Sequence, residues 1–191
     1  TYGTGGVSGY GVYVNGYNNI TLKNANIFEG NTTGSSKYTV YLIGSNYSNI
    51  LNNNISTNGT SGYGIFLFSS SNSTVISNII TTNSSTAYGI YLSTSTNSVV
   101  TSNNIITNGS SSHGIYITRN GNYISKNNIT TLSATTAYGI YGNINMNNTI
   151  IDSNTINSVM NGIEIATGTS NTNWTITNNN ITTTASSAEG I

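Results

Sequence analysis

The chain has 191 residues, of which only 4 are Lys or Arg and 4 are Asp or Glu, so its formal net charge at neutral pH is zero. Ordinary globular proteins are about one quarter charged, and four scattered cations exclude nucleic acid as an expected partner, because phosphate neutralisation requires a basic patch. The chain has no cysteine, which excludes a disulfide scaffold and a thiolate metal site.

The remaining composition is dominated by Asn, Ser and Thr, interrupted by single Ile and Tyr residues. This bias is common in disordered segments, unless the apolar residues are placed regularly. No apolar run approaches the roughly 18 residues that a membrane-spanning helix requires, so we expect no membrane insertion.

A pair formed by Gly and an apolar residue recurs along the chain. In chain order the pairs are Gly11-Val12, Gly64-Ile65, Gly89-Ile90, Gly114-Ile115, Gly139-Ile140, Gly162-Ile163 and Gly190-Ile191, and Thr39-Val40 fills the vacant slot. The glycines at positions 64, 89, 114 and 139 are equally spaced, and the other intervals deviate only slightly from this spacing. A regular period of this kind predicts a solenoid whose small insertions fall in loops.

Each repeat contains two further apolar segments. The second is marked by Ile50, Val75, Val100, Ile124 and Ile150, and the third by Ile55, Ile80, Ile105, Ile129 and Ile156. Segments this short, with alternation such as Ile90-Tyr91-Leu92, predict strands and not helices. Successive repeats would pair in parallel about 4.8 Å apart. Gly142 stands where other repeats have Leu or Ile, which predicts a local gap in the core.

A column of asparagines precedes the third segment. Asn53, Asn78, Asn103 and Asn128 recur with the same period as the glycines. Stacked amides can hydrogen-bond along the solenoid axis, and Asn tolerates the left-handed conformation of sharp corners. We predict that these four residues form a structural, inward-facing Asn ladder.

The stretch from Gly89 to Ile106 reads Gly-Ile-Tyr-Leu, then Asn-Ser, an apolar pair and Asn-Asn-Ile-Ile. It resembles the right-handed parallel β-helix repeats of the pectate-lyase-like superfamily. The resemblance covers residues 1–191 and implies one all-β domain, a single-stranded right-handed parallel β-helix with about 25 residues and three short strands per rung, in about seven rungs plus the start of an eighth. The composition is similar to that of Asn/Thr-rich adhesin-like and surface-layer-associated β-helix proteins. Another solenoid and a disordered chain stay open as alternatives, although the Leu-x-x-Leu-x-Leu frame of leucine-rich repeats is absent.

Pectate lyases and polygalacturonases share this fold, and resemblance to them implies clustered carboxylates that hold Ca²⁺ or an Asp constellation for hydrolysis. The acids of this chain, Glu29, Asp152, Glu164 and Glu189, fall at different positions of the repeat. We therefore predict no catalytic residue, no cofactor and no metal site. A lyase-like or hydrolase-like enzyme is the third of the functions considered.

Strand alternation places an aromatic residue on the outside of the Gly-apolar segment. The predicted exposed stripe is Tyr13, Tyr41, Phe66, Tyr91, Tyr116 and Tyr141, and it stops at Glu164. Such a stripe either binds sugar rings or a neighbouring molecule, or only stabilises the sheet. His113 replaces Tyr in a second column, Tyr38, Tyr63, Tyr88 and Tyr138, and we predict that it fills a stacked corner there.

Glycosylation motifs are numerous, with 12 Asn-x-Ser/Thr triplets among 35 asparagines, a number that the abundance of Ser and Thr explains by itself. Position is more informative, because Asn58, Asn83 and Asn108 each stand at the same distance after the glycine position of their repeat, in the loop before the next rung. These three are the candidate glycosylation sites. Asn128 also begins such a triplet, but we expect the ladder to make it unavailable.

No polar capping element is visible at either end of the sequence, so we expect either a segment of a longer β-helix or a subunit that stacks on its neighbours. The resulting prediction is a non-catalytic structural or adhesive protein, located outside the cell or at its surface, in a filament, sheath or adhesin stalk. Expected partners are copies of the chain, joined end to end or laterally, other surface proteins, and glycans. The alternative is a carbohydrate-binding module that uses the aromatic stripe.

Overall fold

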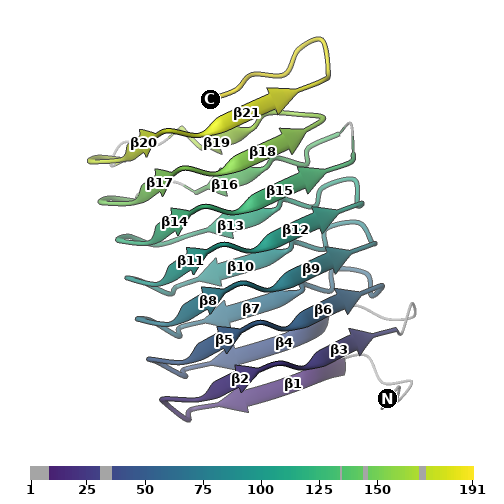
Figure 1. Cartoon of the computed structure of the whole chain (residues 1–191), viewed down its shortest axis with the longest axis vertical. Helices are drawn as coiled ribbons and strands as arrows, with labels where there is room; N and C mark the ends of the chain where they lie inside the picture. Colours follow the sequence, from purple (N-terminus) through teal and green to yellow (C-terminus); the bar gives the residue numbers. More distant parts are fainter. Residues whose placement is uncertain (1–8, 31–35, 134, 144–145, 168–170) are drawn as a thin grey trace.

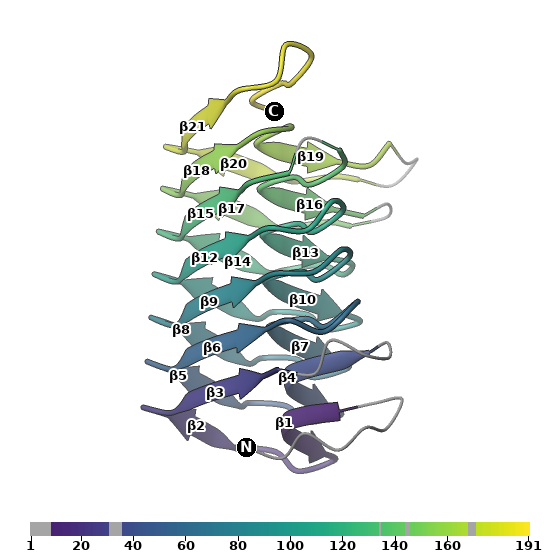
Figure 2. The same ribbon diagram turned by 90° about the vertical axis from the view of Figure 1, so that its right-hand side faces the viewer.

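The computed structural model describes residues 9–30, 36–133, 135–143, 146–167 and 171–191. These residues form an all-β parallel solenoid without a helix, in which three strands make up each rung and the rungs stack from β1 at the bottom to β21 at the top (Figures 1 and 2). The predicted fold class is therefore confirmed. No helix of the described part is long and apolar enough to cross a membrane.

Equivalent strands of successive rungs form three seven-stranded sheets. The first sheet contains β1 (Gly9–Asn15), β4 (Lys37–Ile43), β7 (Ile65–Phe68), β10 (Ile90–Ser93), β13 (Ile115–Ile117), β16 (Ile140–Gly142) and β19 (Ile163–Ile165). The second sheet contains β2 (Thr21–Lys23), β5 (Asn49–Leu51), β8 (Thr74–Ile76), β11 (Val99–Thr101), β14 (Tyr123–Ser125), β17 (Ile150–Asp152) and β20 (Thr175–Thr177). The third sheet contains β3 (Asn26–Glu29), β6 (Asn54–Thr57), β9 (Ile79–Thr82), β12 (Asn104–Thr107), β15 (Asn128–Thr131), β18 (Thr155–Ser158) and β21 (Asn180–Thr183). We number the rungs 1 to 7, so that rung 1 holds β1, β2 and β3.

The core is a set of apolar columns that run along the axis. In β10, Ile90 and Leu92 point inward and are fully buried, and they pair with Ile65 and Leu67 of the rung below and with Ile115 and Ile117 of the rung above. The columns of the third sheet are equally regular, for example Ile80, Ile105 and Ile129. The alternation that the sequence predicts thus places one β-branched or Leu side chain above another throughout the interior.

The gap predicted at Gly142 is filled. A methyl group on Gly142 would lie 2.6 Å from Cη2 of Trp174, so the indole occupies the space that a Leu or Ile side chain takes in other rungs. Trp174 also donates its Nε1 hydrogen to the carbonyl oxygen of Met146, at 3.0 Å. The small residue Gly142 in rung 6 thus makes room for the large side chain of Trp174 in rung 7.

The repeated glycine has a steric origin. A Cβ atom on Gly89 would lie 2.6 Å from the carbonyl oxygen of Gly114 and would also collide with Cγ2 of Ile105. The chain enters the first sheet at this point, where the backbones of successive rungs and the third-sheet column come close together. Glycine therefore fits this approach best. In rung 2 the position is taken by Thr39, which is fully buried and donates its hydroxyl hydrogen to the carbonyl oxygen of Ser56 at 3.0 Å.

One prediction for the second sheet is wrong. The repeat aligns Ile150 with Ile50, Val75, Val100 and Ile124, which are all buried, but Ile150 is 38% exposed, and its neighbour Ile151 is fully buried and pairs with Ile124. An extra residue in the preceding loop shifts the register, and a shift of one residue exchanges the two faces of a strand.

Candidate functional site

The predicted Asn ladder is present, with one member different. The amide nitrogen of each ladder residue except the last donates to the Oδ1 atom of the residue one rung above, at 2.9 to 3.0 Å. The ladder consists of Asn53, Asn78, Asn103, Asn127, Asn154 and Asn179. The backbone N–H groups of five of these residues donate to the same Oδ1 atoms. Each rung is therefore tied to the next by side chains as well as by the sheets.

Asn128 does not belong to this ladder, contrary to the prediction. It points outward from β15 and donates its Nδ2 hydrogen to Oδ1 of Asn104, which lies on the same exposed face at 3.0 Å. Asn127 takes the inward position because the loop before β14 is one residue shorter than in the preceding rung. The reason for expecting Asn128 to be unavailable for glycosylation is therefore removed, since its side chain is exposed.

The corners that hold the ladder use the left-handed backbone region. The residue before each ladder position has a positive φ, 55° at Asn52, 57° at Ser102 and 54° at Lys126. The turn between the second and third sheets consists of these two residues. The first has a left-handed backbone conformation, and the second is the ladder residue, whose amide points inward. Asn and Ser suit such turns because their short side chains tolerate left-handed φ values.

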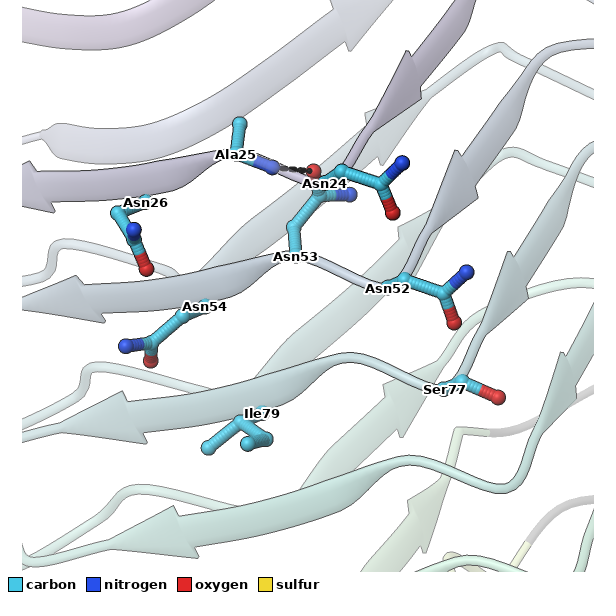
Figure 3. A pocket seen from close by; sticks show the side chains of 8 residues that line it. All are labelled: Asn24, Ala25, Asn26, Asn52, Asn53, Asn54, Ser77 and Ile79. Atoms are coloured by element: carbon cyan, nitrogen blue, oxygen red, sulfur yellow. Dashed lines mark hydrogen bonds between the residues drawn. The ribbon is translucent and has the colours of Figure 1, made fainter.

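The same corner has a shallow groove on its outer side, in the first three rungs, with a volume of about 250 Å³. Its lining residues are Asn24, Ala25, Asn26, Asn52, Asn53, Asn54, Ser77 and Ile79 (Figure 3). Asn53 points back toward Ala25, whose N–H donates to Oδ1 of Asn53 at 3.0 Å, while the amides of Asn52 and Asn54 point to opposite sides (Figure 3). All lining side chains are uncharged, so the groove can offer only neutral hydrogen-bonding groups.

The predicted aromatic stripe stacks as a column on the outside of the first sheet, but it is not an open platform. The rings of Phe66, Tyr91 and Tyr116 are nearly parallel, with centroids 4.9 Å and 4.7 Å apart. Phe66 is only 7% exposed, and of the six stripe residues only Tyr13, in rung 1, has a largely exposed ring. The prediction of an exposed stripe is therefore wrong at Phe66, and the stripe is only partly exposed at Tyr41, Tyr91, Tyr116 and Tyr141.

A second aromatic column covers the first. It contains Tyr10, Tyr38, Tyr63, Tyr88, His113 and Tyr138, each three residues before its stripe partner. Tyr63 and Tyr88 stack at 4.9 Å with an interplanar angle of 2°, and Tyr88 meets Tyr91 edge-on at 86°. Edge-to-face contacts of this kind are favourable because the positive ring edge meets the negative ring face. Burial between the columns raises the pKa of Tyr116 to about 12.

His113 fills one position of the second column, as predicted. Its ring stacks between Tyr88 and Tyr138 at 4.9 Å and 5.2 Å. Its Nδ1 atom accepts a hydrogen bond from the backbone N–H of Tyr138 at 3.1 Å, which places the proton of the neutral ring on Nε2. Burial lowers the pKa of His113 to about 4.

The protein is expected to lose stability between pH 6.5 and pH 4 through this residue. The unfolded chain binds a proton at His113 below pH 6.5, whereas the folded chain does so only near pH 4, so unfolding is favoured as the pH falls through this window. The shift corresponds to about 3 kcal/mol in the free energy of unfolding. Urea unfolding at pH 7.5 and 4.5 measures it. His113→Tyr, which restores the residue type of the column, should remove most of the pH dependence, and an unchanged pH profile in this variant would contradict the assignment.

The four carboxylates lie in separate places. Glu29 is buried at the end of β3, Asp152 lies on the outer face of β17, Glu164 lies on the outer face of β19, and Glu189 lies in the loop after β21. Asp152 accepts hydrogen bonds from Thr177 and Asn178, which lower its pKa. Within the described residues, no three His, Asp or Glu side chains come together in a way that could hold a metal ion.

The candidate glycosylation residues form an outer amide ladder. The Nδ2 atom of Asn83 donates to Oδ1 of Asn58 at 2.8 Å, and Nδ2 of Asn108 donates to Oδ1 of Asn83 at 2.6 Å. These are the nitrogen atoms that N-glycosylation would modify. The three side chains thus contribute hydrogen bonds between the loops of rungs 2, 3 and 4, and their glycosylation stays a prediction.

Comparison with known proteins agrees with this geometry. A family model described as a right handed beta helix region matches residues 5–143, which is more than half of the chain. No curated protein was found to match the chain. The three parallel sheets, the regular period of the repeat and this match lead to one conclusion. The chain belongs to the right-handed β-helix family.

Proposed function

We propose that this β-helix is a non-catalytic structural or adhesive element located outside the cell or at its surface, such as part of a filament, a sheath or an adhesin stalk. The observation that carries the proposal is the density of bonds between successive rungs. Parallel strand pairs join rungs in all three sheets, and the inner Asn ladder adds a side-chain bond at every step from rung 2 to rung 7.

Other columns repeat this pattern elsewhere in the rung. The N–H of Ser45 donates to Oγ of Ser70, and the N–H of Ser70 donates to Oγ of Ser95, at 3.0 Å and 2.9 Å. The aromatic columns and the outer Asn58–Asn83–Asn108 ladder lie outside the sheets and join the same rungs. In a solenoid each rung contacts only its neighbours, so such columns set the stability and stiffness of the rod along its axis.

The placement of the carboxylates supports a non-catalytic role. Glycoside hydrolysis uses two carboxyl groups on either side of one bond, whereas the acids here lie on different sheets or in the final loop. The near absence of charge suits a scaffold in which side chains hydrogen-bond to the equivalent side chains of neighbouring rungs, because like charges in such a column would repel each other. End-to-end association of rods is part of the proposal, because an outermost parallel strand offers the same backbone groups as an interior one.

Electron microscopy of the purified protein at several concentrations, with immunogold labelling of intact cells that produce it, tests this function. Rods or filaments together with gold at the cell surface are the expected result. Labelling confined to the cell interior would contradict the proposal. Binding to a glycan array that is lost on Tyr10→Ala and Tyr13→Ala substitution would favour a carbohydrate-binding module instead.

A further inference from the structure

The outer face of the second sheet differs from the other faces in its chemistry. Two columns of side chains run along it, at the first and third positions of each strand, and all of them except the buried Ser125 are at least partly exposed. In rungs 1 to 6 the first column is Thr21, Asn49, Thr74, Val99, Tyr123 and Ile150, and the second is Lys23, Leu51, Ile76, Thr101, Ser125 and Asp152. We call these twelve residues the second-sheet face. The strands that carry them, β2, β5, β8, β11, β14 and β17, are labelled in Figure 1.

Apolar residues run diagonally across this face. Tyr123 and Ile150 are 37% and 38% exposed, and Leu51, Ile76 and Val99 are partly exposed. In rungs 2 and 3 the apolar residue belongs to the second column, and in rungs 4 to 6 it belongs to the first column. The five side chains therefore follow a diagonal line along the face. Contiguous exposed apolar side chains with a polar rim are typical of an interaction surface.

Among the twelve residues of the second-sheet face, only Lys23 and Asp152 are charged, and they lie at its two ends. The exposed Lys126, in the corner directly after β14, also favours the charged form of Asp152. Lys23 lies in rung 1 and Asp152 in rung 6, both in the second column. Five rung spacings of about 4.8 Å separate them by roughly 24 Å. Asp152 is held in place by Thr177 and Asn178, whose side chains donate to its Oδ1 at 2.8 Å and 3.0 Å.

We propose that two copies of this chain pair through the second-sheet face, with their axes antiparallel. A two-fold axis parallel to the strands and between rungs 3 and 4 brings rung 1 of one copy opposite rung 6 of the other. Each column then faces the same column of the partner, so Lys23 meets Asp152 at both ends of the interface. The contact is isologous and closes with two copies.

The other residue pairs of this arrangement are compatible. Ile76 faces Thr101, Thr74 faces Val99, and Leu51 comes opposite Ser125, which is buried and donates its hydroxyl hydrogen to Thr101 at 3.0 Å. None of these pairs brings like charges together. Tyr47 lies at the corner before β5, at the edge of the face in rung 2, and is 58% exposed. The equivalent corner residue of rung 5 is Gly121, which would lie opposite Tyr47 and has no side chain to collide with it. A parallel arrangement would instead bring the two Lys23 rungs together and the two Asp152 rungs together. Opposite charges across an interface set its orientation.

The outer face of the third sheet provides a matched comparison. Its outward residues in rungs 4 to 6 are Asn104, Ile106, Asn128, Thr130, Thr155 and Asn157. This face has no charged residue at these positions, and its amides hydrogen-bond to each other, as Asn128 does to Asn104. Ile150 and Thr155 are exposed residues of the same rung on the two faces, so the same substitution can be placed on each.

Sedimentation velocity over a concentration series tests the pairing. The chain is expected to pass from monomer to dimer, and Ile150→Lys should raise the concentration needed for dimerisation at least tenfold, because it replaces an exposed apolar side chain of the face by a cation. Thr155→Lys adds the same charge in the same rung and should leave dimerisation unchanged. A monomer at all concentrations, or disruption by Thr155→Lys and not by Ile150→Lys, would overturn the proposal.

Cross-linking tests the orientation, and the absence of cysteine from the chain makes it selective. A mixture of Lys23→Cys and Asp152→Cys variants, treated with a short bis-maleimide, should give covalent dimers that contain one chain of each. Lys23→Cys alone should give few dimers. Equal cross-linking of Lys23→Cys with itself would show parallel pairing and overturn the antiparallel arrangement. The result does not depend on where the protein is located, so it separates this inference from the proposed function.

Discussion

Replacing Asn103 by alanine is expected to lower the free energy of unfolding by about 4 kcal/mol or more, since several buried groups lose their partners. Its Nδ2 atom donates to the carbonyl oxygens of Val75 and Thr101 at 2.9 Å and 3.0 Å and to Oδ1 of Asn127 at 2.9 Å. Its Oδ1 accepts from both the backbone and the side chain of Asn78. Alanine makes none of these side-chain bonds and leaves a cavity. The shift of the urea midpoint, followed by circular dichroism, measures the loss.

Asn104 is the matched control for this substitution. It is the next residue in the chain but points outward, and its amide oxygen accepts a hydrogen bond only on the exposed face, from Asn128. Asn104→Ala should change stability by less than about 0.5 kcal/mol. The pair Asn127→Ala and Asn128→Ala repeats the comparison one rung higher. If Asn128→Ala were the more damaging change, the ladder would run through Asn128 and the register described here would be wrong.

The two register errors of the sequence analysis have one cause. Counting one full period of the repeat from Asn103 arrives at Asn128, although the rung between them is one residue shorter. The spacing within the corner is more reliable. The ladder residue stands three positions after one inward apolar residue and two positions before the next. Val100, Asn103 and Ile105 obey it, as do Ile124, Asn127 and Ile129, and also Ile151, Asn154 and Ile156. A corner of fixed length keeps its internal spacing, whereas loops absorb insertions.

The aromatic stripe shows a different limit of sequence reasoning. Strand alternation correctly places Tyr91 and Tyr116 outside the first sheet, and the repeat correctly aligns His113 with Tyr88. Exposure, however, depends on which neighbouring side chains cover a residue. The rings of the second column fold over the first with edge-on geometry, as Tyr88 does over Tyr91. Periodicity gives the direction of a side chain from the backbone, but not the rotamers of the residues that cover it.

Two buried charged residues in rungs 1 and 2 are expected to be as sensitive to substitution as the ladder. Lys37 is fully buried and Glu29 is 8% exposed. A methyl group on Gly9 would lie 3.5 Å from Nζ of Lys37 and 3.8 Å from Oε1 of Glu29, so both charged groups border the same small space. Removing one member leaves the other charge buried, which typically costs about 3 to 5 kcal/mol. We expect a loss of this size for Glu29→Thr and for Lys37→Met, measured by urea unfolding at pH 7.

The double variant decides whether the two charges act as a pair. Thr is the residue of this column in the next rungs, at Thr57, Thr82 and Thr107, and it can bond to a loop carbonyl as Thr107 does to Ser112. Met keeps the aliphatic stem of Lys37, which packs closely against Gly59, and removes the charge. Replacing both members of a buried ion pair by well-packed neutral residues is often neutral or stabilising. The double variant should therefore be close to the original chain in stability, with hydrogen exchange in rungs 1 and 2 as a local readout. If the losses of the single variants simply added, the charges would be held by separate partners, and the pair would have no role in fixing the first rungs of the solenoid.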